Sequence, residues 1–158
     1  MKNAISISQP LEIMARAGDA LQPLLLLATR WYVSWQFLKS GWLKVTSWDS
    51  TLELFRSEYH VPLLPPHLAA ITGAFGELFF PCLLVLGVGG RTGSLGLTFV
   101  NIMAVISYRQ VLLSEGFEAA LAQHVLWGFM LLLLIVFGNG PIAVDRLIAR
   151  RLHITRNW

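Results

Sequence analysis

Long apolar stretches separated by turn-forming residues dominate this sequence. Four of them approach the length of about 20 apolar residues that a helix needs to cross a bilayer core roughly 30 Å thick. They cover residues 21–43, 68–87, 92–108 and 120–138. Glycine-rich segments at 87–91 and 138–141 interrupt the pattern, so the apolar stretches are expected to end there as separate helices. The pattern therefore predicts four membrane-spanning helices.

The first connection, residues 45–67, is the longest and has a pattern of its own. Trp48, Leu52 and Phe55 recur at helical spacing, which predicts a short amphipathic helix on the membrane surface. The VPLLPP segment that follows is expected to be extended, because proline fixes φ and restricts the residue before it. The predicted fold is all-α, a four-transmembrane-helix bundle with a short amphipathic helix in the first, periplasmic loop.

Composition supports a membrane domain and excludes several other classes. Of the 158 residues, 55% are hydrophobic and 13% are charged, against about 25% charged in an ordinary soluble domain. Mean hydropathy is +0.60. These values exclude a soluble domain and a disordered chain. The single cysteine, Cys82, excludes a disulfide scaffold and leaves no internal dithiol for redox chemistry.

The distribution of lysine and arginine predicts the orientation. Four spans place both termini on one side of the membrane, together with Lys2, Arg16, Arg91, Arg146, Arg150, Arg151 and Arg156. The opposite side holds Lys39, Lys44, Arg56 and Arg109. Because basic residues concentrate in cytoplasmic flanks, both termini are expected in the cytoplasm. Residues 1–20 then form a cytoplasmic or interfacial segment, 21–141 the membrane domain and 142–158 a basic tail. The formal net charge of +3 indicates topology and anionic lipid contacts, and not nucleic acid.

Two ionisable residues fall well inside the predicted spans, where charges are costly. Arg30 and Glu77 each lie nine residues from the start of their span, about 13 Å deep but from opposite faces. We therefore expect an intramembrane ion pair between them, with Ser34 and Asn101 completing a polar cluster. Gly41 and Gly76 lie on the same helix faces and would allow close helix approach. The cluster is either a structural clasp or a site for a proton or an anionic group.

A second polar group is expected nearer the outer end of the spans, formed by His124, Tyr108, Arg109 and Trp127. His124 is compatible with three roles, as a packing residue, as a hydrogen-bond partner of a quinone or other organic ligand, or as a haem ligand. No HxxxH, HExxH or ExxH pair is present, so a metal site within the bundle is disfavoured. Among cofactors, a quinone is favoured over haem.

In order and spacing, several segments resemble the DoxX family of small four-helix membrane proteins. They are Arg30, FLKSGWLK (37–44), GAFGELFFPCLLVLG (73–87), Arg91, His124 and GNGPIAVD (138–145). The similarity covers about residues 22–147. YHVPLLPPHLAA (59–70) looks like a subgroup found beside biosynthetic genes for copper-binding modified peptides.

The resemblance implies a multi-pass protein of the bacterial inner membrane. Family members are linked to membrane oxidoreductases, including a subunit of thiosulfate:quinone oxidoreductase and a mycobacterial protein that tethers a superoxide dismutase and a sulfurtransferase. The first hypothesis is therefore an accessory subunit of a membrane redox system that binds a quinone and contacts soluble or membrane redox proteins. The alternatives are a non-enzymatic scaffold for soluble partners, or a carrier for an anionic metabolite or modified peptide, which would require a homo-oligomer. The resemblance supplies no set of catalytic residues.

Overall fold

The computed structural model describes residues 8–151 and, within them, contains seven helices and no strand. The helices are α1 (Ser8–Thr46), α2 (Trp48–Ser57), α3 (Pro66–Leu86), α4 (Thr92–Ser107), α5 (Arg109–Leu112), α6 (Glu118–Phe137) and α7 (Val144–Arg151). The all-α prediction is confirmed. Lys2 and Arg156, two of the residues used to predict orientation, lie outside the described residues, as do residues 152–158 of the predicted basic tail.

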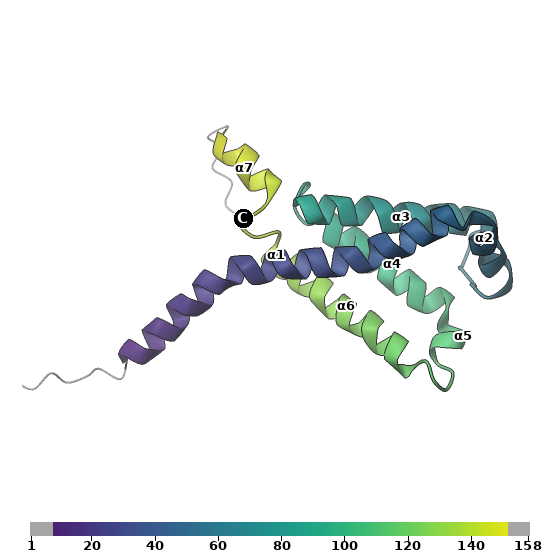
Figure 1. Cartoon of the computed structure of the whole chain (residues 1–158), viewed down its shortest axis with the longest axis horizontal. Coiled ribbons are helices and arrows are strands. Elements are labelled where there is room, and N and C mark those ends of the chain that lie inside the picture. Colours follow the sequence, from purple (N-terminus) through teal and green to yellow (C-terminus); the bar gives the residue numbers. More distant parts are fainter. Residues whose placement is uncertain (1–7, 152–158) are drawn as a thin grey trace, which may run out of the picture.

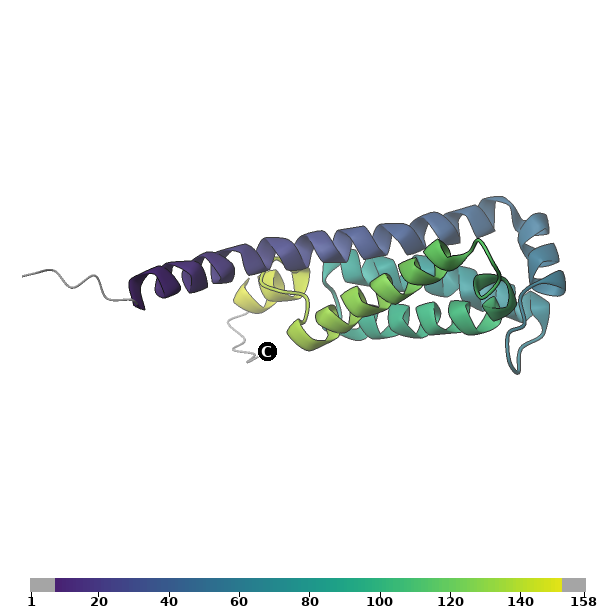
Figure 2. The ribbon, with the colours of Figure 1, turned by 90° about the horizontal axis from the view of Figure 1, so that it is seen from below.

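Four long helices form the body of the protein. The contacts run chiefly from α1 to α3, from α3 to α4 and from α4 to α6, and α6 also returns to α1. Figure 2 shows these helices side by side, with α2 and α5 at one end and α7 at the other. A core of buried aliphatic and aromatic residues lies between them, consisting of Leu26, Val33, Phe37, Leu84, Leu97, Leu131 and Leu134.

Two of the four helices meet the length and hydropathy expected of a membrane span by themselves, α3 and α6. At 16 residues, α4 is apolar but shorter. Large hydrophobic side chains point outward on all four, such as Trp35 on α1, Phe75 on α3, Phe99 on α4 and Phe129 on α6. The described part of the chain thus has two helices suited to cross a membrane, and exposed hydrophobic side chains lie on all four long helices.

Helix α1 is longer than the apolar stretch that predicted it. It begins at Ser8 and runs without interruption through the predicted boundary at residues 20 and 21. Its first part extends beyond the other helices, where residues 10–22 are almost entirely exposed. The bend in its first half (Figure 1) is consistent with Pro23, which removes a backbone hydrogen bond inside the helix.

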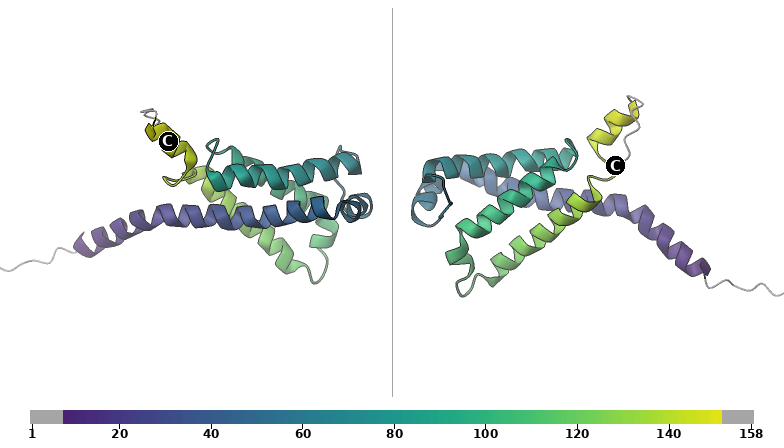
Figure 3. Two further views of the ribbon diagram at one scale, coloured as in Figure 1. Left: turned by 45° about the horizontal axis from the view of Figure 1, so that its top comes forward. Right: turned by 180° about the vertical axis from the view of Figure 1, so that it is seen from behind.

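The predicted amphipathic helix in the first connection is α2, and Phe55 on it is 5% exposed. Phe55 packs with Ala69 and Ala70 of α3 in a second small core. Residues 58–65, which we call the strap, then lead to α3 without regular structure. Pro66 begins α3 and Pro65 before it is extended, as the sequence predicts. The views in Figure 3 show α2 lying across the ends of α1 and α3.

Candidate functional site

A cavity of about 340 Å³ lies between α3 and α4, toward the α2 end of the bundle. We call it the inner cavity. Its walls are mainly apolar, with Phe75 and Phe80 from α3 and Phe99 and Val100 from α4. Phe75 and Phe99 are 59% and 65% exposed, so the cavity opens on the outer surface of the bundle. Its volume is within the range of about 300–1,000 Å³ that is typical of small-molecule sites.

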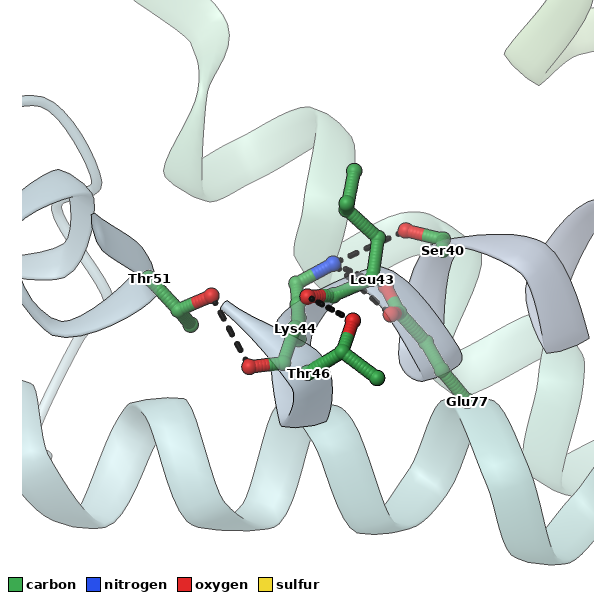
Figure 4. Close-up of polar contacts among 6 residues, drawn as sticks. All are labelled: Ser40, Leu43, Lys44, Thr46, Thr51 and Glu77. Carbon is green, nitrogen blue, oxygen red and sulfur yellow. Dashed lines mark hydrogen bonds and ion pairs between the residues drawn. The ribbon is translucent and has the colours of Figure 1, made fainter. Parts of the chain in front are cut away.

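The polar end of the inner cavity is an ion pair between α1 and α3. Lys44 Nζ lies 2.7 Å and 2.9 Å from the two carboxylate oxygens of Glu77, and 2.9 Å from Ser40 Oγ. All three ammonium protons therefore have acceptors. The Lys44 and Glu77 side chains are only 13% and 10% exposed, so this charge-assisted contact is much less screened by solvent than a surface pair. Figure 4 shows the pair bridging the two helices.

Glycines allow the helices to come close enough to build this site. A Cβ placed at Gly41 would lie 2.9 Å from Glu77 Cβ, and one at Gly76 would lie 2.8 Å from Val100 Cγ2. Real Cβ atoms essentially never make contacts of this length. Gly41 therefore permits the approach of α1 to α3, and Gly76 the approach of α3 to α4, as the small residues on these faces predicted.

Tyr59, in the strap, closes the α2 end of the inner cavity. Its ring stacks on Phe55 and on Tyr108, with ring centroids 4.7 Å apart in both pairs. Tyr108 in turn donates a hydrogen bond of 2.9 Å to Glu58. Burial of the phenol, with a further contribution from the negative charge of Glu77, raises the pKa of Tyr59 to about 12. The Tyr59 hydroxyl therefore remains a neutral hydrogen-bonding group at physiological pH.

The predicted ion pair between Arg30 and Glu77 is wrong. The Arg30 guanidinium, in a residue 1% exposed, donates to four backbone carbonyls. They belong to Leu84 and Val85 at the end of α3 and to Asn139 and Ile142 in the turn after α6, at 2.6–2.8 Å. Carbonyls at a helix C-terminus carry partial negative charge, which compensates a buried cation.

Arg30 and Glu77 lie at different depths because α1 does not enter the bundle where its apolar stretch begins. Arg30 lies level with Leu84, which is seven residues, or about 10 Å, further along α3 than Glu77. The carboxylate is instead reached by Lys44, whose long side chain extends back along α1. The charges of Arg30 and Glu77 are therefore each compensated within the chain, at different heights in the bundle and by different partners.

Arg30 belongs to a clasp that joins the ends of α3 and α6. Within the clasp, Asn139 donates to the Gly90 carbonyl, and the Gly90 N–H donates to Asp145. Position 87 favours glycine for two reasons. Its φ of +70° is a conformation that other residues rarely adopt, and a Cβ there would lie only 2.6 Å from Ala143 Cβ. Four of the five N–H groups of Arg30 donate to these carbonyls, so only one remains for a further anion.

A third polar group lies between α4 and α6. The Asn101 amide donates to the His124 carbonyl at 2.9 Å, so its oxygen is the acceptor for His124 Nδ1, at 2.8 Å. This assigns the proton of the neutral imidazole to Nδ1 and leaves a lone pair on Nε2. The His124 and Trp127 rings meet edge to face with centroids 4.9 Å apart. Buried Trp127 Nε1 has no hydrogen-bond partner among the described residues.

The two predicted groups are thus rearranged. Arg30, Glu77 and Asn101 lie in three separate contacts, and buried Ser34 Oγ has no partner in the described part of the chain. Of the outer group, His124 and Trp127 do lie together. Tyr108 instead joins Tyr59 in the ring stack, and Arg109 is exposed at the start of α5.

Sequence reasoning missed Lys44 and Tyr59 as site residues. Lys44 is at the end of an apolar stretch, where a basic residue ordinarily indicates topology. The one feature of the sequence that could have indicated a polar contact of Lys44 within the bundle is Ser40, which lies four residues earlier on the same helix face. Tyr59 falls in an irregular connection, and the sequence has no pattern that places such a residue in space. Among the residues that the structure describes, no group of three His, Cys, Asp or Glu side chains gathers as a metal site.

Comparison with known proteins finds one family model and one relative. An uncharacterized protein of Haemophilus influenzae is 27% identical over 137 residues, which cover 84% of this chain and 88% of that relative. No solved structure matches. The DoxX family model matches residues 25–110, a range that includes every residue lining the inner cavity but not His124 or Trp127. The chain therefore belongs to the DoxX family.

Proposed function

We propose that this protein is a four-span accessory subunit of a redox system in the bacterial inner membrane, and that it holds a quinone in the inner cavity. The observation that carries the proposal is the cavity itself, an apolar space that opens on the outer surface between α3 and α4 and has a buried ion pair at one end. A lipid-soluble molecule with a polar head matches this distribution of apolar and polar walls.

Each wall has a separate part in binding. Phe75, Phe80 and Phe99 offer aromatic surface to a quinone ring and its apolar chain. Lys44 can donate to a quinone carbonyl when it gives up its contact with Ser40 Oγ, and Glu77 can accept from a hydroquinone hydroxyl. The opening between α3 and α4 faces lipid when the four helices span the bilayer, so the ligand reaches the cavity without crossing water.

The four-span arrangement with both termini in the cytoplasm is part of this proposal. It is supported by family membership, by the outward apolar side chains on all four helices and by the excess of basic residues on the side of α7. The apolar α4 has 16 residues, and the four residues of α5 follow it after a break at Tyr108.

Two alternatives receive different support. A scaffold that recruits soluble proteins would use the exposed arginines in the last turn of α7, Arg150 and Arg151, and its test is capture of a defined partner that depends on them. A carrier for an anionic metabolite or peptide is less well supported, because Arg30, its expected counter-ion, is occupied by four carbonyls.

The binding proposal is tested with purified protein and a quinone that has a short alkyl chain. In Gly73→Leu the new side chain enters the inner cavity, where a Cβ meets only Phe55 Cζ, at an ordinary 3.5 Å. We expect affinity to fall about tenfold or more, equivalent to about 1.4 kcal/mol. Gly18→Leu is the matched control, because this glycine is also helical but has no neighbour within 4 Å. Equal affinity in the two variants would overturn the proposal.

A further inference from the structure

A second cavity of about 340 Å³ lies on the other side of the strap. We call it the outer cavity. Arg56, His60 and Pro62 line it, and all three are exposed to solvent at the α2 end of the molecule. None of them lines the inner cavity. The outer cavity therefore belongs to the aqueous surface, whereas the inner cavity opens between α3 and α4.

The two cavities share a common wall. Five residues line both of them: Phe55, Tyr59, Val61, Leu64 and Ala69. Two of these, Phe55 and Tyr59, are stacked aromatic rings, and the stack continues onto Tyr108. The boundary between the cavities consequently consists of residues from the strap together with one residue each of α2 and α3.

The hydrogen bonds of the strap lie mainly at its start, where the N–H groups of Glu58 and Tyr59 donate to the Leu54 carbonyl, and residues 61–64 make none within the described part of the chain. The His60 N–H donates to the Ser107 carbonyl at 2.9 Å, and Tyr108 donates to Glu58 beside it. At its tip, Leu63 has a φ of +67° and is fully exposed, a costly conformation for a leucine. A segment with few hydrogen bonds, exposed side chains and local strain opens at lower free energy than the helices around it.

We propose that the two cavities form one passage, which connects the lipid-facing opening with the aqueous surface at the α2 end, and that the Tyr59 ring is its gate. The passage rests on the four-span arrangement proposed above. Its occupant is an amphipathic molecule that lies in the inner cavity with its head beside Lys44 and Glu77, and movement of the Tyr59 ring exposes that head to water at the strap. A water-soluble partner at the strap could then reach the head of a ligand that never leaves the membrane.

Thiol labelling in sealed vesicles tests the passage without any quinone. Cys82 is first replaced by serine, and Ala104→Cys is introduced as the reporter, because Ala104 lines the inner cavity and not the outer one. A membrane-impermeant thiol reagent is added on the strap side. Removing the ring in Tyr59→Ala should accelerate labelling roughly tenfold, since the closed state loses both aromatic stacks. Tyr59→Phe keeps the stacks and should label at the original rate.

The unaltered chain supplies the control. Cys82 is exposed on the outer surface of α3, so the same reagent should not reach it through the bilayer, with or without Tyr59→Ala. A second reporter does not depend on the gate: Leu64→Cys, on the shared wall but 41% exposed, should react with Tyr59 intact. An unreactive Leu64→Cys, or labelling of Ala104→Cys that is unaffected by Tyr59→Ala in a folded protein, would overturn the passage. If labelling behaves as expected but no quinone binds, only the proposed ligand fails.

Discussion

At the scale of single residues, the pair of Lys44 and Glu77 is the most consequential polar contact. Both side chains are largely withdrawn from solvent, so removing one leaves the other charge without compensation. We expect Lys44→Met to destabilise the protein by about 3–5 kcal/mol. The double variant Lys44→Met/Glu77→Met should recover most of this loss, because no charge then remains. Thermal unfolding in detergent measures both.

The exposed pair of Arg56 and Glu53 is the matched control for that experiment. Its atoms are 3.9 Å apart and its side chains are 60% and 71% exposed, so Arg56→Ala should cost less than about 1 kcal/mol. Equal effects of Lys44→Met and Arg56→Ala would mean that the buried position of the first pair has no energetic consequence.

Tyr59 makes the stability of the folded protein depend on pH in the alkaline range. Its pKa is about 12 in the folded chain, against 10.0 for a free phenol. The unfolded chain therefore ionises first, and the contribution of Tyr59 to stability is complete below pH 10 and declines as the pH rises from 10 toward 12. Tyrosinate absorbance during a pH titration should show a late-titrating tyrosine that is absent in Tyr59→Phe. If that variant titrates like the original protein, the buried position of the phenol is wrong.

Much of the residue-scale chemistry could be predicted, but not its pairing. Hydropathy identified Arg30 and Glu77 as polar residues within apolar stretches, and both are buried, at 1% and 7% exposure. Their partners depend on where each helix enters the bundle and on backbone carbonyls, which every sequence has at every position. Nothing in the sequence distinguishes the carbonyls of Leu84 and Val85, which accept from Arg30, from those of their neighbours.

At the scale of helices, the clasp around Arg30 determines how α7 is attached. Arg30→Leu removes four charge-assisted hydrogen bonds, each worth about 1.5–3 kcal/mol when intact, although water can replace part of them. We expect faster hydrogen exchange across residues 138–151, with little change in α4. Arg91→Ala is the comparison, because Arg91 also binds carbonyls at the end of α6 but is exposed. Uniformly faster exchange in Arg30→Leu would indicate general unfolding instead of a local release.

Helix existence was more predictable than helix extent. The spacing of Trp48, Leu52 and Phe55 identified α2, and its buried face follows from that spacing. The first part of α1 carries Glu12 and Arg16 and is too polar to register as a span, although an (i, i+4) pair is compatible with a helix. Hydropathy indicates which residues suit the interior of a membrane. A span predicted from it therefore ends where the polar residues begin, even when the helix continues.

At the scale of the whole molecule, the number of membrane spans determines which loops and termini lie on the same side of the membrane. The start of α1 and α7 lie at one end of the bundle, and α2 and α5 at the other. In a four-span protein with cytoplasmic termini, Gly18 is then on the cytoplasmic side and Glu115, between α5 and α6, on the periplasmic side. Two cysteine variants in a Cys82→Ser background separate the possibilities, because Gly18 and Glu115 are both exposed.

In intact spheroplasts, an impermeant thiol reagent should label Glu115→Cys at once, and Gly18→Cys only after lysis. The reverse pattern would keep the four spans and invert the orientation predicted from basic residues. Labelling of both from the same side would contradict a four-span bundle, because an odd number of crossings must separate the two positions. Since the inner cavity opens between α3 and α4, that last result would also remove the lipid-facing opening on which quinone binding depends.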